Sequence, residues 1–260
     1  MRKFTLVLLM ILGLNSCTTP EKLAYLNNLN DHGSLEYFTM SVPDYKIQYR
    51  DILYITIKAM TPDGTIRDFL STAGTMSTGT YSQSEASQYL YGYEVGKDGK
   101  ILLPVIGSLP IAGSNLEEAR YIIQNAADNF FKNSTVECKL LSFKFTVIGE
   151  VKAPGTYINY NNYLTVFEAL GRAGGVSDFA RHDRIQVIRP FEGGTKTFVL
   201  NLQDKSILTN EAYFLLPNDV IIVEPESRKI FNLNLPIFSF IITSATSVFM
   251  TTLLLIEYFK

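Results

Sequence analysis

The spacing of hydrophobic and polar positions divides the chain into an interior that alternates and two ends that are continuously apolar. From 45 to 57, apolar and β-branched residues alternate with polar ones, which predicts strand structure. From 61 to 87 the chain is rich in Ser, Thr and Gly and poor in large aliphatic residues, which predicts a long loop.

The next segment predicts a hairpin followed by a capped helix. Two strand-like runs between 93 and 103 flank Asp98-Gly99, a dipeptide that favours hairpin turns. Ser114 lies three residues before Glu117, which is the spacing of a capping box, and apolar residues then recur every three or four positions to residue 126. We therefore expect Ser114 to cap a helix, with another strand at 136–140.

A second block of similar style follows from residue 143. It contains a strand to Val151, then Pro154-Gly155 in the order that a type II turn requires, and a helix over 164–173. Thr165 or a neighbour is expected to cap this helix, and Gly174-Gly175 to end it. Further strands are predicted at three places, the last one after the turn-forming Asn218-Asp219: 185–188, 197–200 and 220–223. Two blocks of strands and short helices predict an α+β fold with small mixed sheets.

The amino-terminal end has the layout of an export signal. A positive Met1-Arg2-Lys3 precedes an apolar run over 4–14 that is too short to span a bilayer. Leu14-Asn15-Ser16-Cys17 resembles a bacterial lipobox, so we predict a signal peptide over 1–16 and acylation of Cys17, with palmitate among its acyl chains. Residues 17–44 then form a lipidated tether or arm. A plain secretory signal with an incidental Cys is the alternative.

The carboxy-terminal end is long enough to cross a membrane. No charged residue occurs from 230 to 256, and Pro236 suits the first turn of a helix. The following 20 or so residues would extend about 30 Å, so we predict a transmembrane helix within 228–260.

Hydroxyl residues gather on one arc of this predicted helix, and we take them as candidate pore-facing positions: Ser239, Thr243, Thr246, Ser247 and Thr251. Two interpretations stay open. In one, a single helix is embedded in lipid and its hydroxyls bond to its own backbone. In the other, the helix assembles with copies of itself and turns its hydroxyls inward. The second is favoured by the predicted lipid on Cys17, because a chain that is already anchored needs no second anchor.

Composition excludes several kinds of chemistry. The 260 residues carry 23 Lys and Arg against 25 Asp and Glu, with no basic run, which argues against nucleic acid as a partner. The only Cys besides Cys17 is Cys138, expected to be buried and inert, and the two His lack partners at ligand spacing, so we predict no metal site.

No catalytic motif stands out either. The chain contains no nucleotide-binding or hydrolase motif, so we predict no cofactor and no enzyme activity. Glu168 and Asp178 form the nearest approach to a carboxylate pair, but a structural role is expected for Glu168 on its helix.

Several motifs occur in an order that resembles one known family. The first are Tyr45-x-Ile47-x-x-x-Asp51-x-Leu53-x-Ile55-x-Ile57 and Asp98-Gly99-x-Ile101-x-Leu103-Pro104. The later ones are Val147-Ile148-Gly149-Glu150-Val151-x-x-Pro154-Gly155, the helix from Leu164, and Leu216-Pro217-Asn218-Asp219-Val220-Ile221. Together they resemble the outer-membrane polysaccharide export lipoproteins, with an export domain over 45–142 and a soluble-ligand-binding β-grasp domain over 143–227. The family usually has Gly before the first Asp, where this chain has Arg50.

The resemblance implies a function. Members form rings, commonly octamers, in the outer membrane of Gram-negative bacteria, with most of their mass in the periplasm. Their carboxy-terminal helices form a porin-like channel for capsular or extracellular polysaccharide, and an inner-membrane polysaccharide co-polymerase, often a tyrosine kinase, docks from below. The alternatives are a membrane-tethered glycan-binding or sensing module without a pore and, with least support, a periplasmic enzyme.

Overall fold

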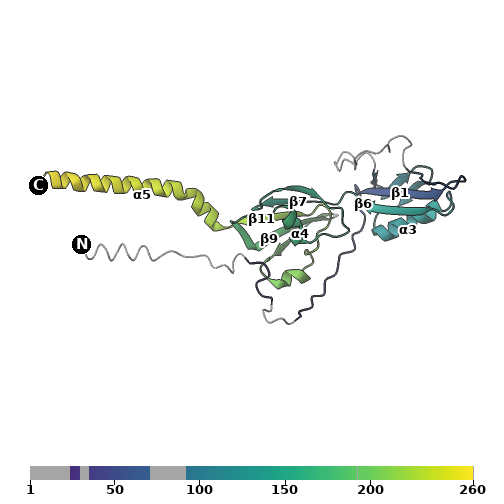
Figure 1. Cartoon of the computed structure of the whole chain (residues 1–260), viewed down its shortest axis with the longest axis horizontal. Coiled ribbons are helices and arrows are strands. Elements are labelled where there is room, and N and C mark those ends of the chain that lie inside the picture. Colours follow the sequence, from purple (N-terminus) through teal and green to yellow (C-terminus); the bar gives the residue numbers. More distant parts are fainter. Residues whose placement is uncertain (1–23, 30–34, 71–91, 192, 260) are drawn as a thin grey trace.

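The computed structural model describes residues 24–29, 35–70, 92–191 and 193–259. Figure 1 shows an elongated molecule in which two domains and a long helix follow one another. The domain at one end is built from residues within 45–142, the β-grasp domain lies in the middle, and the carboxy-terminal helix extends from the opposite end.

The first domain is a small antiparallel sheet covered by one helix. Strand β1 is central: it pairs with β2 and β3 on one edge and with β6 along the other. A separate hairpin of β4 and β5 completes the domain. The bounds are β1 (Ile52–Met60), β2 (Ile66–Asp68), β3 (Tyr93–Glu94), β4 (Lys100–Leu103), β5 (Gly107–Pro110), α3 (Leu116–Ala127) and β6 (Thr135–Leu140).

The core of this domain follows directly from residue spacing. In β1 every second residue from Leu53 to Ala59 is buried, as expected for a strand with one face on the core. Helix α3 turns Ala119, Ile123 and Ala127 inward at intervals of four residues and packs on β6. The expected α+β character is therefore present in this domain.

Several local expectations for the first domain are wrong. Residues 45–51 form no strand, and the loop expected from residue 61 contains β2, which pairs back onto β1. Asp98-Gly99 does form a turn, but the flanking strands pair elsewhere, β3 with β1 and β4 with β5. After the turn, β4 pairs with β5 over four residues, and before it β3 joins the edge of β1 over two.

The cap of α3 also lies one residue further along than expected. Asn115 is the N-cap, and Glu118 completes the capping box by accepting a hydrogen bond from the backbone N–H of Asn115. Asn and Ser cap helices almost equally well, so Ser114 and Asn115 compete, and the register of the buried face decides between them.

The second domain has a mixed five-stranded sheet in the order β10-β9-β11-β7-β8. The central strands β11 and β7 are parallel, and all other neighbours are antiparallel. One helix, α4, follows the first hairpin, which is the β-grasp arrangement of hairpin, helix and returning strands. The bounds are β7 (Lys144–Gly149), β8 (Gly155–Ile158), α4 (Val166–Arg172), β9 (Ala180–Phe191), β10 (Gly194–Leu200), the 3₁₀ helix η2 (Lys205–Thr209) and β11 (Val220–Pro225).

Two predicted local features of this domain can be compared with the structure. Thr165 caps α4, and Glu168 closes the capping box, so the structural role expected for Glu168 is confirmed. The type II turn at Pro154-Gly155 is wrong, because Gly155 lacks the positive φ that such a turn needs and begins β8 instead. The glycine with a steric requirement is Gly149, at φ +93, where an added Cβ would lie 2.1 Å from the carbonyl oxygen of Val223.

The terminal helix begins earlier than the expected position of Pro236 in its first turn implied. Helix α5 (Ser227–Tyr258) begins well before Pro236, which lies inside it. Pro236 has no N–H to donate to the preceding turn, and Figure 1 shows the helix bent near its base. The start is set by the sheet rather than by proline, because the N–H of Glu226, at the end of β11, donates to the carbonyl of Phe179.

Candidate functional site

Two turns of the same construction face each other where the two domains meet. Gln48-Tyr49-Arg50-Asp51 precedes β1, and Leu216-Pro217-Asn218-Asp219 precedes β11. In each turn the third residue has a positive φ, +72 for Arg50 and +68 for Asn218. The aspartate in each then accepts a hydrogen bond from the backbone N–H three residues earlier.

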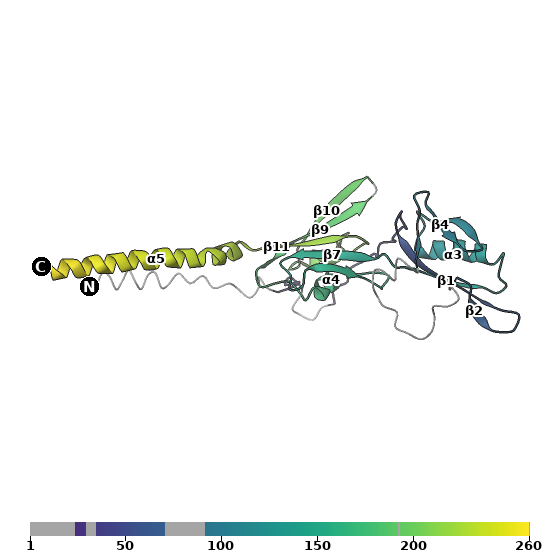
Figure 2. The ribbon, with the colours of Figure 1, turned by 90° about the horizontal axis from the view of Figure 1, so that it is seen from above.

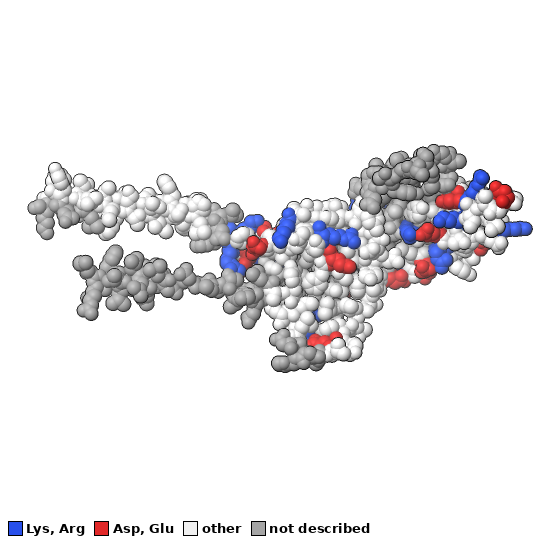
Figure 3. Space-filling view, viewed as in Figure 1, with Lys and Arg blue, Asp and Glu red and all other residues white. Residues whose placement is uncertain are grey.

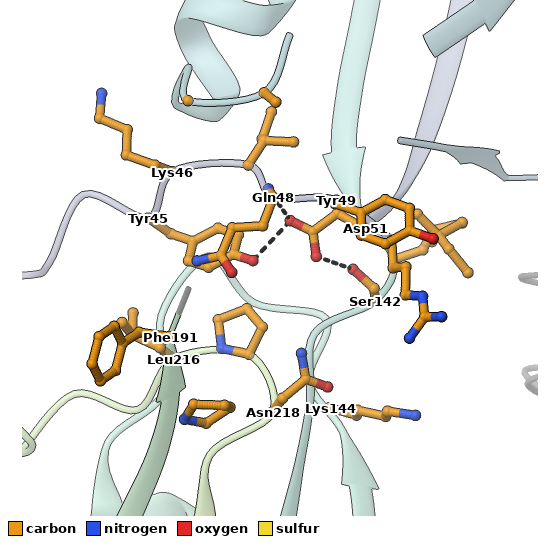
Figure 4. A pocket seen from close by; sticks show the side chains of 18 of the residues that line it. Tyr45, Lys46, Gln48, Tyr49, Asp51, Ser142, Lys144, Phe191, Leu216 and Asn218 are labelled. Carbon is orange, nitrogen blue, oxygen red and sulfur yellow. Dashed lines mark hydrogen bonds between the residues drawn. The ribbon is translucent and has the colours of Figure 1, made fainter. Parts of the chain in front are cut away.

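Asp51 is buried at 3% exposure and is held by neutral donors. The Tyr45 hydroxyl donates to Oδ2 at 2.7 Å, the Gln48 N–H to the same oxygen at 2.8 Å, and the Ser142 hydroxyl to Oδ1 at 3.0 Å. Burial raises the pKa of the Asp51 carboxyl, and these hydrogen bonds oppose the rise. Asp51 thus joins three parts of the export domain: the chain before β1, the turn itself and the segment after β6 (Figure 4).

Asp219 is fully buried and is held by a cation. Arg189 donates from Nε to Oδ1 at 3.0 Å and from Nη2 to Oδ2 at 2.8 Å, and its Nη2 also reaches the Phe214 carbonyl at 2.9 Å. Burial raises the pKa of the Asp219 carboxyl, and Arg189 opposes the rise. The predicted turn at Asn218-Asp219 is confirmed, but its partner, 30 residues away on β9, has no signal in the local pattern.

Between these turns lies a cleft of about 1310 Å³, which we call the interdomain cleft. Figure 4 shows side chains of both domains facing it, and Figure 2 shows the tip of the β9–β10 hairpin leaning toward the export domain. Its wall comes from both turns, the arm before β1, the segment between the domains and the hairpin tip. The lining residues are Tyr45, Lys46, Ile47, Gln48, Tyr49, Arg50, Asp51, Ile52, Lys97, Gly99, Ala112, Gly113, Leu141, Ser142, Lys144, Ile158, Pro190, Phe191, Leu216, Pro217 and Asn218.

The wall of the interdomain cleft is positive. Four cationic side chains line it, and the one acid among the lining residues, Asp51, is buried. Lys46 is already paired with Glu118 at 3.2 Å and Asp44 at 3.3 Å. The other three, Arg50, Lys97 and Lys144, are exposed and form no ion pair with any residue in the described part of the chain.

Aromatic rings complete this wall. Tyr49 and Phe191 are exposed and come from opposite domains, and the Arg50 guanidinium lies over the Tyr49 ring at 5.2 Å from its centroid. Such rings offer flat apolar surfaces. Together with the cations they form a cleft that suits a ligand with apolar faces and negative groups, and none of these positions was predicted as a site from the sequence.

The predicted site residues lie elsewhere, on α5. Cys17 falls outside the described residues. All five hydroxyl positions are exposed, and four of them, Ser239, Thr243, Thr246 and Thr251, donate to carbonyl groups of the preceding turn of the same helix. These bonds satisfy the hydroxyl protons and leave oxygen lone pairs available as acceptors.

Within the described residues, α5 alone is long and apolar enough to cross a membrane. The candidate span is Leu235–Ile256, 22 residues, and no part of it is buried against the protein. Figure 3 shows charged side chains at the base of this helix, and the sequence of the candidate span contains no Lys, Arg, Asp or Glu.

Comparison with known families agrees with this architecture. Residues 40–141 match the model of the polysaccharide biosynthesis/export proteins, and residues 144–200 match the model of the SLBB domain. These two matches confirm the resemblance to the polysaccharide export family that the motifs predicted.

Two curated relatives share part of the chain. The EPS I polysaccharide export outer membrane protein EpsA of Ralstonia solanacearum is 32% identical over 147 residues, which is 54% of this chain and 38% of that protein. EpsA of Ralstonia nicotianae is 34% identical over 89 residues, 33% of this chain and 23% of that protein. The matched part therefore spans less than two fifths of either relative.

Proposed function

We propose that the chain is a subunit of an outer-membrane channel that exports capsular or extracellular polysaccharide from the periplasm to the cell surface. The membership of the family and the names of the relatives support the export role and the outer membrane. No enzyme activity is part of this proposal. Copies of the chain form a ring, proposed as an octamer, and α5 of each copy lines the passage.

The observation that carries the proposal is the unburied helix α5. A span of 22 uncharged and mostly apolar residues extends about 33 Å, which matches the hydrocarbon core of a bilayer, and nothing in the described protein covers it. Apolar surface of this extent is unstable in water. Lipid on one face and neighbouring copies on the other would cover it.

The contacts of the amino-terminal arm support a lipid anchor at the end of the molecule from which α5 extends. Tyr25 packs on Phe167 and His182 of the β-grasp domain, and the backbone N–H of Leu26 donates to Leu202. The eight peptide links between Cys17 and Tyr25 span at most about 28 Å when the chain is extended. An acyl chain on Cys17 and helix α5 would therefore enter one membrane together.

The hydroxyl arc suggests which part of the passage is wet. Met250 and Leu254 fall in the same arc as Thr251, at 100° per residue, so the polar stripe is densest over 239–247, nearer the β-grasp domain. We expect water to contact this half of the span. The unused acceptor lone pairs of its hydroxyls would bond to water there.

A deletion tests the need for the helix. Removal of residues from Ile230 onward is expected to abolish surface polysaccharide and to leave a folded, lipidated periplasmic part. A control with an unrelated apolar helix of equal length keeps a membrane anchor but removes the hydroxyl arc. Normal export by the deletion variant would refute the proposal. Normal export by the control would show that α5 serves only as a membrane anchor.

Cysteine labelling tests the orientation of the helix. A single Cys at position 239, 243 or 247 is expected to react with a water-soluble maleimide in the assembled complex, and one at 242 or 249 is expected to be protected. Background from Cys138 is low, because burial raises the pKa of its thiol to about 12 and keeps it protonated. Reversed labelling would place the hydroxyls against lipid.

The glycan-binding module without a pore remains a second candidate, favoured by the hydroxyl bonds within α5, which satisfy an isolated helix. Electron microscopy of detergent-extracted protein separates the two. Rings would support the channel, and monomers or dimers would support the tethered module. A co-polymerase in the inner membrane is proposed as the partner of the ring.

A further inference from the structure

We infer that the interdomain cleft binds an acidic segment of the exported polysaccharide, namely sugars that carry carboxylate groups. The inference rests on the proposed export function and adds to it both a ligand class and a binding site. Three features of the cleft wall support the inference. They are an excess of positive charge, backbone strain at Arg50 and exposed aromatic rings.

The first argument is charge. Arg50, Lys97 and Lys144 face the cleft without an ion-pair partner in the described chain. The buried carboxylate of Asp51 forms no ion pair with them, and one negative charge would in any case leave the wall with a net positive charge. Several exposed cations along one wall attract a ligand with a series of negative charges.

The second argument is backbone strain at Arg50. Its φ of +72 is a conformation that Gly and Asn adopt readily, and the equivalent position of the other turn is Asn218 at +68. Nothing in the turn itself requires a long cationic side chain there. Strain of this kind is typical of functional positions, and here it places a guanidinium over Tyr49 at the mouth of the cleft.

The third argument is size and surface. The volume, about 1310 Å³, exceeds the ~300–1,000 Å³ of pockets for small ligands, so a short stretch of glycan fits better than one sugar. Tyr49 and Phe191 present exposed rings from the two domains, on which the apolar faces of sugar rings can pack. A glycan in the cleft would touch both domains at once.

A second copy of this chain is the competing occupant. Its segment would have to bring carboxylates to the same cations, and an ordered protein contact there would exclude glycan. The two occupants differ in a measurable way, because loss of cleft cations would change the oligomer in one case and glycan affinity in the other.

The experiment is calorimetric titration of the full chain in detergent micelles. The ligand is a hexamer of galacturonic acid, and the matched neutral ligand is the same hexamer with its carboxyls methyl-esterified. The acidic hexamer is expected to bind about tenfold or more tightly than the ester, and its affinity to fall as salt rises from about 50 to 300 mM. Equal binding of the two hexamers would overturn the inference.

Variants locate the site. The pair Lys97→Gln and Lys144→Gln is expected to weaken binding of the acidic hexamer about tenfold, and Tyr49→Ala to weaken binding of both hexamers. Lys58→Gln with Lys132→Gln removes two exposed cations outside the cleft and should have no effect. Unchanged affinity in the cleft pair would overturn the inference, as would a change in oligomer size without a change in affinity.

A cleft that does not bind the acidic hexamer can be distinguished from a chain that does not export polysaccharide. Truncation of α5 tests export and leaves the cleft intact, so export can be lost on truncation while the cleft binds nothing. In that case the channel stands and the binding site falls. If the cleft binds the acidic hexamer and export stays normal after truncation of α5, the binding site stands and the channel proposal falls.

Discussion

The two aspartate turns that face the interdomain cleft share a backbone and differ in how their carboxylates are held. Asp219 is bound by Arg189 inside the β-grasp domain, whereas Asp51 is bound by Tyr45, Gln48 and Ser142 from three separate segments. A buried carboxylate needs donors, but either a cation or a set of neutral groups can supply them. The kind of donor determines whether removal of the aspartate leaves a buried cation or only neutral groups without a hydrogen-bond partner.

The two aspartates also differ in which part of the protein their hydrogen bonds stabilise. The Asp219–Arg189 pair lies within one sheet, between β9 and the start of β11, and so stabilises one domain. The contacts of Asp51 tie Tyr45 and Ser142, near the two ends of the export domain, to the start of β1, and all three residues line the interdomain cleft, whereas Asp219 does not. The shape of the interdomain cleft therefore depends more on Asp51 than on Asp219.

The largest effect is expected from Asp219→Asn. The variant keeps the shape but leaves the Arg189 guanidinium buried without its counter-charge, which costs about 3–5 kcal/mol. Hydrogen exchange of amides in β9 and β11 of the full chain measures the loss locally. The control variant, Asp219→Asn combined with Arg189→Met, removes both charges and should recover much of the lost stability. A single variant within about 1 kcal/mol of the wild type would show that the pair is not needed.

Asp51→Asn is expected to cost less, about 1–3 kcal/mol at neutral pH. It strands no cation, but the amide nitrogen cannot accept the bonds that one carboxylate oxygen accepted. Exchange of amides in β1 and β6 reports the effect. Ser142→Ala, which removes a single donor, should cost only about 0.5–1.5 kcal/mol. If Asp51→Asn proved as costly as Asp219→Asn, the contrast between the two turns would be wrong.

The two turns have Arg50 and Asn218 at the position with positive φ, and placing each residue type in the other turn should change stability with opposite sign. Arg50→Asn is expected to stabilise the export domain by up to about 1 kcal/mol, because Asn tolerates the positive φ better than Arg. Asn218→Arg should destabilise the β-grasp domain by a similar amount. Thermal unfolding of both variants measures this, and a destabilised Arg50→Asn would mean that the contact with Tyr49 outweighs the strain.

The smallest effect concerns pH. Because burial raises the pKa of Asp51 above its unfolded value of 3.8, the stability this group contributes is fully present below pH 3.8 and is lost as pH rises through its folded pKa. Asp51→Asn lacks this dependence. The stability difference between wild type and variant should therefore narrow from about pH 3.8 toward neutrality. A gap that widened would mean that the hydrogen bonds outweigh burial and lower the pKa.

Local sequence was sufficient for features that depend on a few neighbouring residues. The alternation in β1, the cap of α4 at Thr165, and the Asn218-Asp219 turn were predicted because each is set by residues within one turn or strand. The apolar tail was predicted for the same reason, since composition over about 20 residues is a local property.

Pairing was decided by tertiary structure. The strands around Asp98-Gly99 suit a hairpin locally, yet β3 pairs with β1 and β4 with β5, because strands compete for edges that only the folded sheet provides. For the same reason the sequence alone did not assign Arg189 to Asp219, and it did not reveal the interdomain cleft, whose wall comes from segments as far apart as 45 and 218. A pattern in the chain records what each residue prefers nearby, and the fold determines which distant residues become neighbours.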